Sequence, residues 1–311
     1  MMFWKKKNKD NVNTSGQSAH EEMTDPVNIN VVIRTDLGNV RTNNEDAASF
    51  IRVSDEELLR SKGYLLMVAD GMGGHNAGEV ASKMAVDIIH QEYFKHSNEK
   101  NREKLLAAAF NAANKKIFEQ ASAHENYRGM GTTCTAIALV AGTIYFAHAG
   151  DSRAYLYKNK KANRITQDHT YVQELVNNGN ISSAEADTHP QRNILTNAMG
   201  TKPAMRVDTG RYPEPFDEYD RILICSDGLY DYLSDEEIGA VMESGTLQEA
   251  ADYFINEAKK RGGKDNITVV MAEHASRITG SNIKETRVAD MPVITRDAEI
   301  PGDLNSTDHD R

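Results

Sequence analysis

Met67-Val68-Ala69-Asp70-Gly71-Met72-Gly73-Gly74-His75 is the stretch that decides the fold. The apolar run that begins at Tyr64 ends abruptly at Asp70, three glycines follow within four residues, and a helical pattern starts near Asn76. This order predicts a buried strand that delivers a carboxylate to a tight loop, because glycine lets the backbone approach a ligand closely. An ordinary turn between a strand and a helix is the competing interpretation.

A dinucleotide-binding loop matches this stretch less well. Asn76 stands where the third glycine of G-x-G-x-x-G belongs. A carboxylate beside a phosphate is also repulsive unless a cation lies between them. Asp70 therefore indicates a metal site, whose other ligands are expected elsewhere in the chain.

The composition disfavours several classes of protein. The chain has 311 residues, of which 39% are hydrophobic, enough for one large domain or two ordinary ones. The net charge of -10, from 36 basic and 46 acidic side chains, disfavours a nucleic-acid partner. No apolar run approaches the roughly 18 residues of a membrane helix, so stable membrane insertion is not expected. Cys134 and Cys225 form no disulfide framework, which favours a reducing, cytoplasmic location.

Hydrophobic periodicity predicts strands and paired helices between two polar ends. Strands are expected at 29–35, 64–69, 133–140, 143–149, 153–157, 206–212, 221–225 and 267–272, and helices at 77–96, 102–123, 171–178, 234–242 and 247–261. The connections 141–142 and 150–152 are short enough for antiparallel hairpins, and 55–62 is expected to be a charged connector. We predict a disordered leader at 1–26, one domain at 27–275 and a flexible tail at 276–311.

Aspartates recur at the ends of the predicted strands. Asp70, Asp151 and Asp227 each follow an apolar run and precede glycine or serine, whereas Asp265 precedes its strand. A single aspartate of this kind is commonly a turn residue. Four of them at one edge of a sheet would repel one another unless cations neutralise them. Because all the candidate ligands are oxygen donors, Mn²⁺ or Mg²⁺ suits the cluster better than Zn²⁺.

Such a cluster suits the hydrolysis of a phosphate ester. Carboxylates can hold two ions about 3.5–4 Å apart, and the two ions acidify a water molecule that attacks at neutral pH. Arg41 is the best candidate for holding the phosphate oxygens, because a guanidinium binds two of them in a fork. The alternative role of Arg41 is an ion pair with Glu45, four residues along the chain.

Six motifs carry a resemblance to a known family. They are Arg41-Thr42-Asn43-Asn44-Glu45-Asp46, Asp70-Gly71-Met72-Gly73-Gly74-His75, Gly131-Thr132-Thr133, Gly150-Asp151-Ser152-Arg153, Ser226-Asp227-Gly228 and Asp265-Asn266-Ile267-Thr268. In this order they resemble the motifs of the metal-dependent protein phosphatases, the 2C-type serine/threonine phosphatases, over about residues 28–273. The second motif is similar to the bacterial branch. The resemblance implies an α+β fold, a four-layer αββα sandwich of two antiparallel sheets flanked by helix pairs.

The resemblance also implies the main roles at the site. Two Mn²⁺ or Mg²⁺ ions are expected at one end of the sandwich. Asp70 would bridge both ions, and the Gly71 carbonyl would bind one of them. Asp227 and Asp265 would complete the other, and Arg41 would bind the substrate phosphate. A metal-bound hydroxide would then attack phosphorus in line, without a phosphoenzyme.

The resemblance to the family also implies supporting roles for further residues. Glu45 and Asp46 would hold metal-bound waters or support the ligands. Asp151 matches the ligand of a third, weaker ion in bacterial members. Residues 168–199 match a mobile segment beside the site, which we call the flap.

The proton donor is the one departure from the family pattern. Some members carry a histidine directly after Asp-Gly, proposed as the general acid for the leaving alkoxide. Here that position is Met72, which cannot donate a proton. His75 lies nearby in the sequence, and His189, in the flap, is our candidate substitute. A metal-bound water, or a surface histidine with no catalytic role, is the alternative.

The predicted function is Mn- or Mg-dependent hydrolysis of phosphoserine and phosphothreonine in proteins of a bacterial cytoplasm. The expected partners are phosphorylated proteins and a cognate Ser/Thr protein kinase, and the protein is expected to be a monomer. The alternatives are a catalytically weak regulator that binds phosphoproteins and a two-metal phosphodiesterase. The presence of Asp70, Asp227 and Asp265 disfavours the regulator, and the acidic charge disfavours a nuclease.

Overall fold

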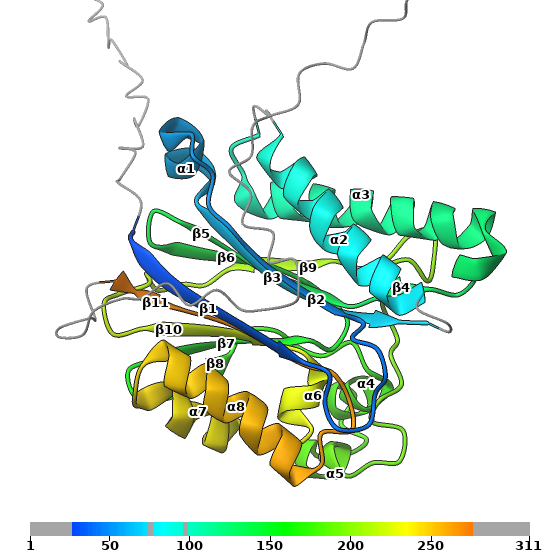
Figure 1. The fold of residues 1–311 in the computed structure, drawn as a ribbon. Helices are drawn as coiled ribbons and strands as arrows, with labels where there is room; N and C mark the ends of the chain where they lie inside the picture. The colour runs from blue at the N-terminus through cyan, green and yellow to red at the C-terminus, as the bar shows by residue number, and fades with distance from the viewer. Residues whose placement is uncertain (1–26, 74–76, 96–98, 276–311) are drawn as a thin grey trace, which may run out of the picture.

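Two antiparallel β-sheets lie face to face, and pairs of helices cover their outer faces (Figure 1). The computed structural model describes residues 27–73, 77–95 and 99–275. The arrangement confirms the predicted αββα sandwich. The predicted leader and tail, at 1–26 and 276–311, lie outside the described residues, and so does His75.

Every described pairing between strands is antiparallel. The first sheet has the order β1 (Ile29–Asp36), β11 (Ile267–His274), β10 (Arg221–Cys225), β7 (Arg153–Lys158) and β8 (Lys161–Arg164). The second has the order β2 (Asp46–Ile51), β3 (Tyr64–Met72), β5 (Cys134–Val140), β6 (Thr143–Ala149) and β9 (Asp208–Arg211), and β4 (Gly131–Thr132) pairs with β3.

Each sheet has its own pair of long helices. The second sheet is covered by α2 (Ala77–Phe94) and α3 (Arg102–Ala123), and the first by α7 (Asp235–Glu243) and α8 (Leu247–Arg261). Both α7 and α8 begin with a capping box, Ser234 with Glu237 and Thr246 with Glu249. In each box the two side chains satisfy backbone N–H groups that the first turn leaves free, which fixes the helix start.

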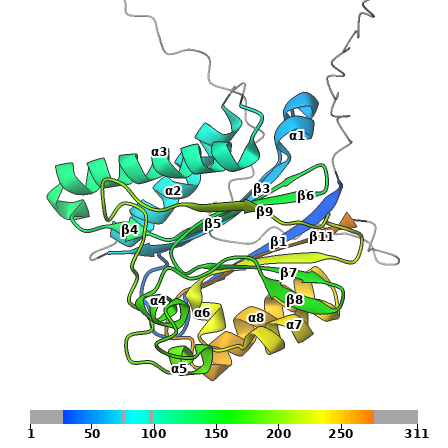
Figure 2. The same cartoon turned by 180° about the vertical axis from the view of Figure 1, so that it is seen from behind.

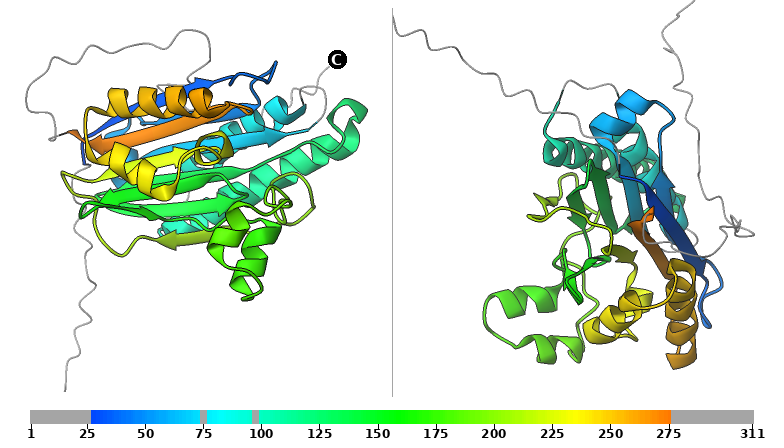
Figure 3. Two further views of the ribbon diagram at one scale, coloured as in Figure 1. Left: turned by 90° about the horizontal axis from the view of Figure 1, so that it is seen from below. Right: turned by 90° about the vertical axis from the view of Figure 1, so that its left-hand side faces the viewer.

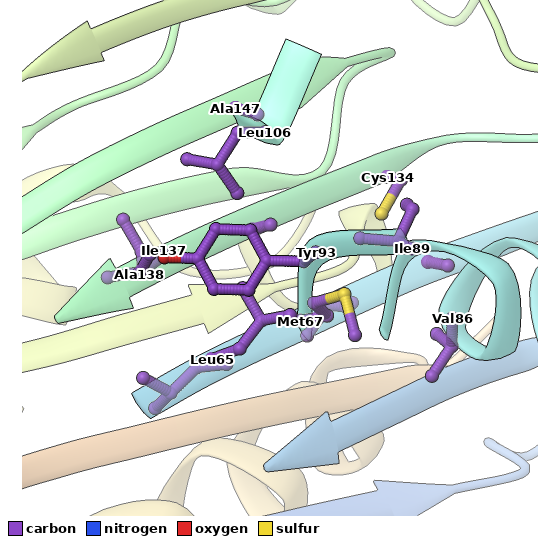
Figure 4. Packing of buried hydrophobic residues seen from close by; sticks show 14 of the residues in the cluster. Leu65, Met67, Val86, Ile89, Tyr93, Leu106, Cys134, Ile137, Ala138 and Ala147 are labelled. Atoms are coloured by element: carbon purple, nitrogen blue, oxygen red, sulfur yellow. The ribbon is translucent and has the colours of Figure 1, made fainter. Parts of the chain in front are cut away.

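The strand that leads to Asp70 is buried on both faces. β3 lies between the α2–α3 layer and the first sheet, and its residues from Tyr64 to Ala69 are all buried. Leu65 and Met67 pack with Ile89 and Tyr93 of α2 (Figure 4). A strand covered on both faces has no polar side to alternate with, which explains its continuous apolar run.

The predicted charged connector at 55–62 is wrong, because Glu56–Lys62 forms helix α1. The Asp55 side chain accepts a hydrogen bond from the Leu58 N–H and caps the start of the helix. Gly63, at φ 69°, ends it, and Leu59 is buried. The capping signal was present in the sequence, but one buried leucine among charged residues shows too little periodicity to predict a helix.

One of the two predicted hairpins forms and the other does not. β5 and β6 pair through Ala141 and Gly142, whose φ values of 48° and 77° are those of a two-residue hairpin turn. The prediction for residues 150–152 is wrong, since β6 belongs to the second sheet and β7 to the first. These residues cross from one sheet to the other and carry Asp151 at the crossing.

The polar region after β7 holds more structure than the single helix predicted there. It contains β8, α4 (Tyr171–Asn177) and the short helix α5 (Ser183–Asp187). The two helices belong to the flap and project from the body of the sandwich (Figure 3). The strand predicted at 206–212 is shortened to β9. Among the described residues, no helix combines the length and apolar character needed to cross a membrane.

Candidate metal centre

The predicted acidic residues come from different elements to one edge of the sandwich. Asp46 on β2 and Asp70 on β3 are opposite each other in the strand register. Asp227 is the first residue of the short helix α6 (Asp227–Tyr230), and Asp265 lies two residues before the start of β11. Their charges interact, because Asp46, Asp227 and Asp265 all raise the pKa of Asp70. In Figure 1 this edge lies where the loop between β1 and β2 meets α6.

The backbone of Asp70 is held by the threonines of the Gly131-Thr132-Thr133 motif. The Asp70 N–H donates to Thr133 Oγ1 at 3.0 Å. Its carbonyl accepts from Thr132 Oγ1 and from the Thr133 N–H, both at 2.9 Å. Three hydrogen bonds on one residue fix the direction in which the carboxylate leaves the strand.

Gly71 occupies a position that no other residue can fill. Its N–H donates to the Glu45 carbonyl at 3.1 Å. A Cβ atom at this position would lie 2.2 Å from the Gly78 carbonyl oxygen and 2.5 Å from that of Glu45. The glycine therefore serves a close approach of three chain segments, as expected for an interior glycine in a strand.

Ser226 and Asn266 are residues of the site to which the sequence analysis gave no role. Ser226 Oγ donates to Asp46 Oδ2 at 2.8 Å. Asn266 accepts from the Glu45 N–H at 2.8 Å and donates to the carbonyls of Leu37 and Asn43. An amide both donates and accepts, so Asn266 connects the loop before β2 to the start of β11. Both residues lie directly beside an aspartate of the motifs, Ser226 before Asp227 and Asn266 after Asp265.

The electrostatics of this edge favour a cation. Burial, followed by the neighbouring carboxylates, raises the pKa values of Asp70 and Asp227 well above their usual range. Burial also raises the pKa of Asp46 to about 6 and that of Asp151 to about 7. Asp227 Oδ1 is buried and has no hydrogen-bond partner in the part of the chain that the structure describes. A buried carboxylate oxygen without a donor is unfavourable unless a cation faces it.

The donor set fits hard divalent ions that keep water. All the candidate ligands are oxygen atoms, which suits Mg²⁺ or Mn²⁺. Among the described residues, no three acidic, histidine or cysteine side chains come close enough to enclose an ion by themselves. An ion here would therefore retain water molecules among its ligands, as Mg²⁺ usually does in proteins.

Arg41 lies at the rim of this edge. Its Nη2 atom is 2.6 Å from Asp265 Oδ2, and 47% of its side chain is exposed. Glu45, the partner considered in the sequence analysis, is half-buried, and burial raises the pKa of its carboxyl. The guanidinium is thus placed beside the carboxylates and open to an incoming anion.

Asp151 and His189 occupy different surroundings. Asp151 is buried, its carbonyl accepts from the Tyr230 hydroxyl at 3.0 Å, and its charge raises the pKa values of Asp70 and Asp227. His189 lies just after α5, where its Nδ1 accepts from the Gln191 N–H at 3.1 Å. The described contacts of His189 are local to the flap, so its assignment as proton donor stays a prediction.

The raised pKa values predict that the metal-free protein is less stable at higher pH. The unfolded-state pKa of an aspartate is about 3.9. Stability from Asp46 and Asp151 is then present below about pH 4 and is lost as the pH rises through about 6 and about 7. We expect the Tm in EDTA to fall from pH 5 to pH 8, and saturating Mn²⁺ to reduce that fall. An unchanged Tm in EDTA across this range would contradict the prediction.

Comparisons with known proteins agree with this geometry. The family model described as "Protein phosphatase 2C" matches residues 40–268. The "Serine/threonine phosphatase stp" of Listeria innocua is 38% identical over 244 residues, which are 77% of this chain and 94% of that protein.

The chain is also similar to solved structures of bacterial serine/threonine phosphatases. The crystal structure of the Mycobacterium tuberculosis serine/threonine phosphatase PstP/Ppp has a TM-score of 0.68 at 36% identity, covering 79% of this chain and 98% of that one. The catalytic domain of PstP in complex with two manganese ions has a TM-score of 0.65 at 34% identity, covering 79% and 97%. Since the matched region extends over most of the sandwich and contains all the acidic residues of its edge, this chain belongs to the protein phosphatase 2C family.

Proposed function

We propose that this protein hydrolyses phosphoserine and phosphothreonine in other proteins, with Mn²⁺ or Mg²⁺ as its cofactor. The observation that carries the proposal is the cluster of half-buried carboxylates of Asp70, Asp227 and Asp265, with the exposed guanidinium of Arg41 beside it. The relatives named serine/threonine phosphatases support the same activity.

The residues of this edge have distinct tasks in the proposed reaction. Asp70, the Gly71 carbonyl, Asp227 and Asp265 would hold two divalent ions. When bound, the ions supply positive charge that acidifies a water molecule and neutralises phosphoryl oxygens. Arg41 exchanges its contact with Asp265 for the substrate phosphate, whose oxygens match its fork of donors.

The surrounding residues keep this geometry fixed. Ser226 and Asn266 hold Asp46 and Glu45, which are proposed to support the waters around the ions. Asp151 is proposed to hold a third, weaker ion. Because the Ser226 hydroxyl and the Asn266 amide are themselves bound to backbone groups of other elements, little reorganisation is needed as charge develops on the phosphoryl group.

The activity is tested with phosphopeptides. A phosphothreonine peptide should release phosphate only when Mn²⁺ or Mg²⁺ is added, and removal of the ion by EDTA should abolish turnover. A phosphotyrosine peptide and a DNA phosphodiester serve as comparison substrates and are expected to react much more slowly. Preference for the diester would replace the proposal with a phosphodiesterase. Phosphopeptide binding that survives EDTA, without hydrolysis, would replace it with a binding protein.

His189 remains our proposed general acid for the leaving alkoxide. We expect His189→Ala to lower kcat on a phosphothreonine peptide by about 10²-fold, the lower part of the range for general acid catalysis. An activated aryl phosphate has a leaving group that needs no proton, so its kcat should change little. Equal losses on both substrates would remove the assignment, since a positional effect does not depend on the leaving group.

The remaining parts of the proposal concern the setting of the reaction. We propose that a Ser/Thr protein kinase produces the substrates, that the protein is monomeric and that it acts in the cytoplasm. The buried free thiols of Cys134 and Cys225 are compatible with a reducing compartment. Size-exclusion chromatography with light scattering tests the monomer, and fractionation of cells tests the location.

A further inference from the structure

The two ends of the flap meet at His169. The His169 N–H donates to the Gly150 carbonyl at 2.7 Å, and the Thr196 N–H donates to the His169 carbonyl at 2.8 Å. The ring takes part as well, because the Asn197 amide nitrogen lies 2.8 Å from His169 Nδ1. One residue at the start of the flap is thus bound to two residues at its end and to the crossing between the sheets.

The hydrogen bonds of the ring determine its tautomer. The Gly150 N–H donates to Nδ1 at 3.2 Å, so Nδ1 carries no hydrogen and accepts. The hydrogen therefore lies on Nε2, which is 3.0 Å from Asp208 Oδ2 on β9. The side chain of His169 is 0% exposed, and burial lowers its pKa, which keeps the ring neutral. Asp208 orients the ring so that Nδ1 faces the backbone of Gly150 and the end of the flap.

Residues on both sides of Asp151 are bound to the first residues of the flap. Gly150 precedes Asp151 and is held by His169. Arg153 follows it and binds the Asp168 carboxylate at 2.7 and 3.1 Å. The same guanidinium lies 3.6 Å from the centre of the Tyr230 ring, whose hydroxyl donates to the Asp151 carbonyl. The position of Asp151 is therefore fixed by contacts with the first residues of the flap and with Tyr230 of α6.

A second buried histidine, His148, packs against His169. His148 on β6 is fully buried, and its ring centre is 4.7 Å from that of His169. Its Nε2 lies 3.1 Å from the Gln167 carbonyl oxygen, and its Nδ1 lies 2.8 Å from Thr135 Oγ1, whose hydroxyl donates to the Ser152 carbonyl at 2.7 Å. Burial lowers the pKa of His148 to about 3, so this ring also stays neutral.

The outer part of the flap is held less firmly. Its helices α4 and α5 have 7 and 5 residues. Arg192 in the flap contacts Asp231 at the end of α6 at 3.2 Å, an ion pair whose side chains are 44% and 26% exposed. Exposed ion pairs of this kind contribute little, so the buried contacts at His169 are better placed to set the position of the flap. Figure 2 shows α4 and α5 beside α6, on the side of the molecule where β4 lies.

We propose that His169 is a positioning residue of the phosphatase: through Nδ1 it clamps both ends of the flap to Gly150 and so fixes the flap and Asp151 relative to each other. The inference rests on the proposed function, because the flap borders the site where a phosphoprotein would bind. His169 itself touches neither the carboxylates of the main edge nor Arg41 in any described hydrogen bond. Its effect is therefore expected on protein substrates rather than on the chemistry of a small ester.

Three variants distinguish the proposed hydrogen-bonding role of His169 from a role in packing alone. His169→Asn keeps an acceptor oxygen close to the position of Nδ1, whereas His169→Gln keeps a donor toward Asp208 and loses that acceptor. Asn197→Ala removes the donor at the far end of the flap, together with the two hydrogen bonds of that side chain to the Arg206 backbone, at a half-buried position where folding is expected to persist. His124→Gln, an exposed histidine at the end of α3, is the control.

We expect His169→Gln and Asn197→Ala to raise KM for a phosphothreonine peptide by about tenfold, the effect of losing one or two net hydrogen bonds. The kcat of both variants on an aryl phosphate, at saturating Mn²⁺, should stay within about twofold of the unaltered protein, and His169→Asn should restore KM. Trypsin should cleave after Arg192 faster in the first two variants, while His124→Gln changes nothing.

Three results would overturn the inference. They are equal losses of kcat on both substrates, an unchanged rate of cleavage in Asn197→Ala, and faster cleavage with an unchanged KM. If the unaltered protein released no phosphate from the peptide, the proposed function would fail instead. The cleavage rates would still report on the clamp, because proteolysis needs no catalytic activity.

Discussion

Asp227→Asn is expected to lower kcat on a phosphothreonine peptide by about 10²- to 10³-fold. Asp227 is half-buried, and its buried Oδ1 has no hydrogen-bond partner among the described residues, so an ion is the partner that this oxygen requires. Loss of a charged ligand removes several kcal/mol of charge stabilisation, and each 1.36 kcal/mol corresponds to a factor of about ten. Phosphate release at several Mn²⁺ concentrations measures the loss.

Asp227→Asn should also make the metal-free protein more stable, although it lowers the activity. An amide removes one of the buried negative charges that repel each other at this edge, so the Tm in EDTA is expected to rise. Asp252→Asn is a matched control, because Asp252 is an exposed carboxylate on α8 that pairs with Arg34. Nearly full activity of Asp227→Asn at saturating Mn²⁺, with a lowered Tm, would show that Asp227 is structural.

Arg41→Ala is expected to lower kcat/KM for the phosphothreonine peptide by about 10²-fold, mostly through KM. The guanidinium contacts Asp265 and is half-exposed, so it can bind phosphate oxygens in the substrate complex. A charge-assisted, two-pronged contact of this kind is worth about 3 kcal/mol, which corresponds to that factor. Arg41→Lys should recover only part of the loss, because an ammonium keeps the charge but not the fork.

Inhibition by inorganic phosphate gives an independent measurement of the same contact. The inhibition constant should rise in Arg41→Ala together with KM, since the product has the same oxygens as the substrate group. Arg34→Ala is the control, because this arginine on β1 pairs with Asp252 on the outer surface. Unchanged inhibition by phosphate in Arg41→Ala would mean that Arg41 only neutralises Asp265.

Much of the acidic edge could be predicted from the sequence, because an aspartate next to a predicted strand is itself evidence for a metal ligand. Asp70 follows a long apolar run, and a strand buried on both faces produces such a run wherever it occurs. Asp227 and Asp265 stand beside small or polar residues in short motifs. Because carboxylate oxygens favour hard cations, the same residues also restrict the cofactor to ions such as Mg²⁺ and Mn²⁺.

The supporting residues could not be found in this way. Ser226 and Asn266 have polar side chains of a kind that is common in turns, and their partners are far along the chain. His169 shows no sign in the sequence that it joins Gly150 to Asn197, which lie 19 positions before it and 28 after it. A hydrogen bond between distant residues depends on the register of strands and the path of loops, and hydrophobic periodicity reports neither.

The sequence by itself determined the main strands and long helices, the oxygen-donor character of the site and the position of Arg41 among its motifs, because these follow from local patterns, whereas the layers of the sandwich were implied by the family resemblance. Only the tertiary structure decided that residues 150–152 cross between the sheets instead of forming a hairpin. Two strands buried on both faces show the same apolar pattern whether or not they are neighbours, so pairing is set by packing of the whole chain. That crossing places Asp151 beside α6 and the flap, where its neighbours come from elements that the sequence alone does not bring together.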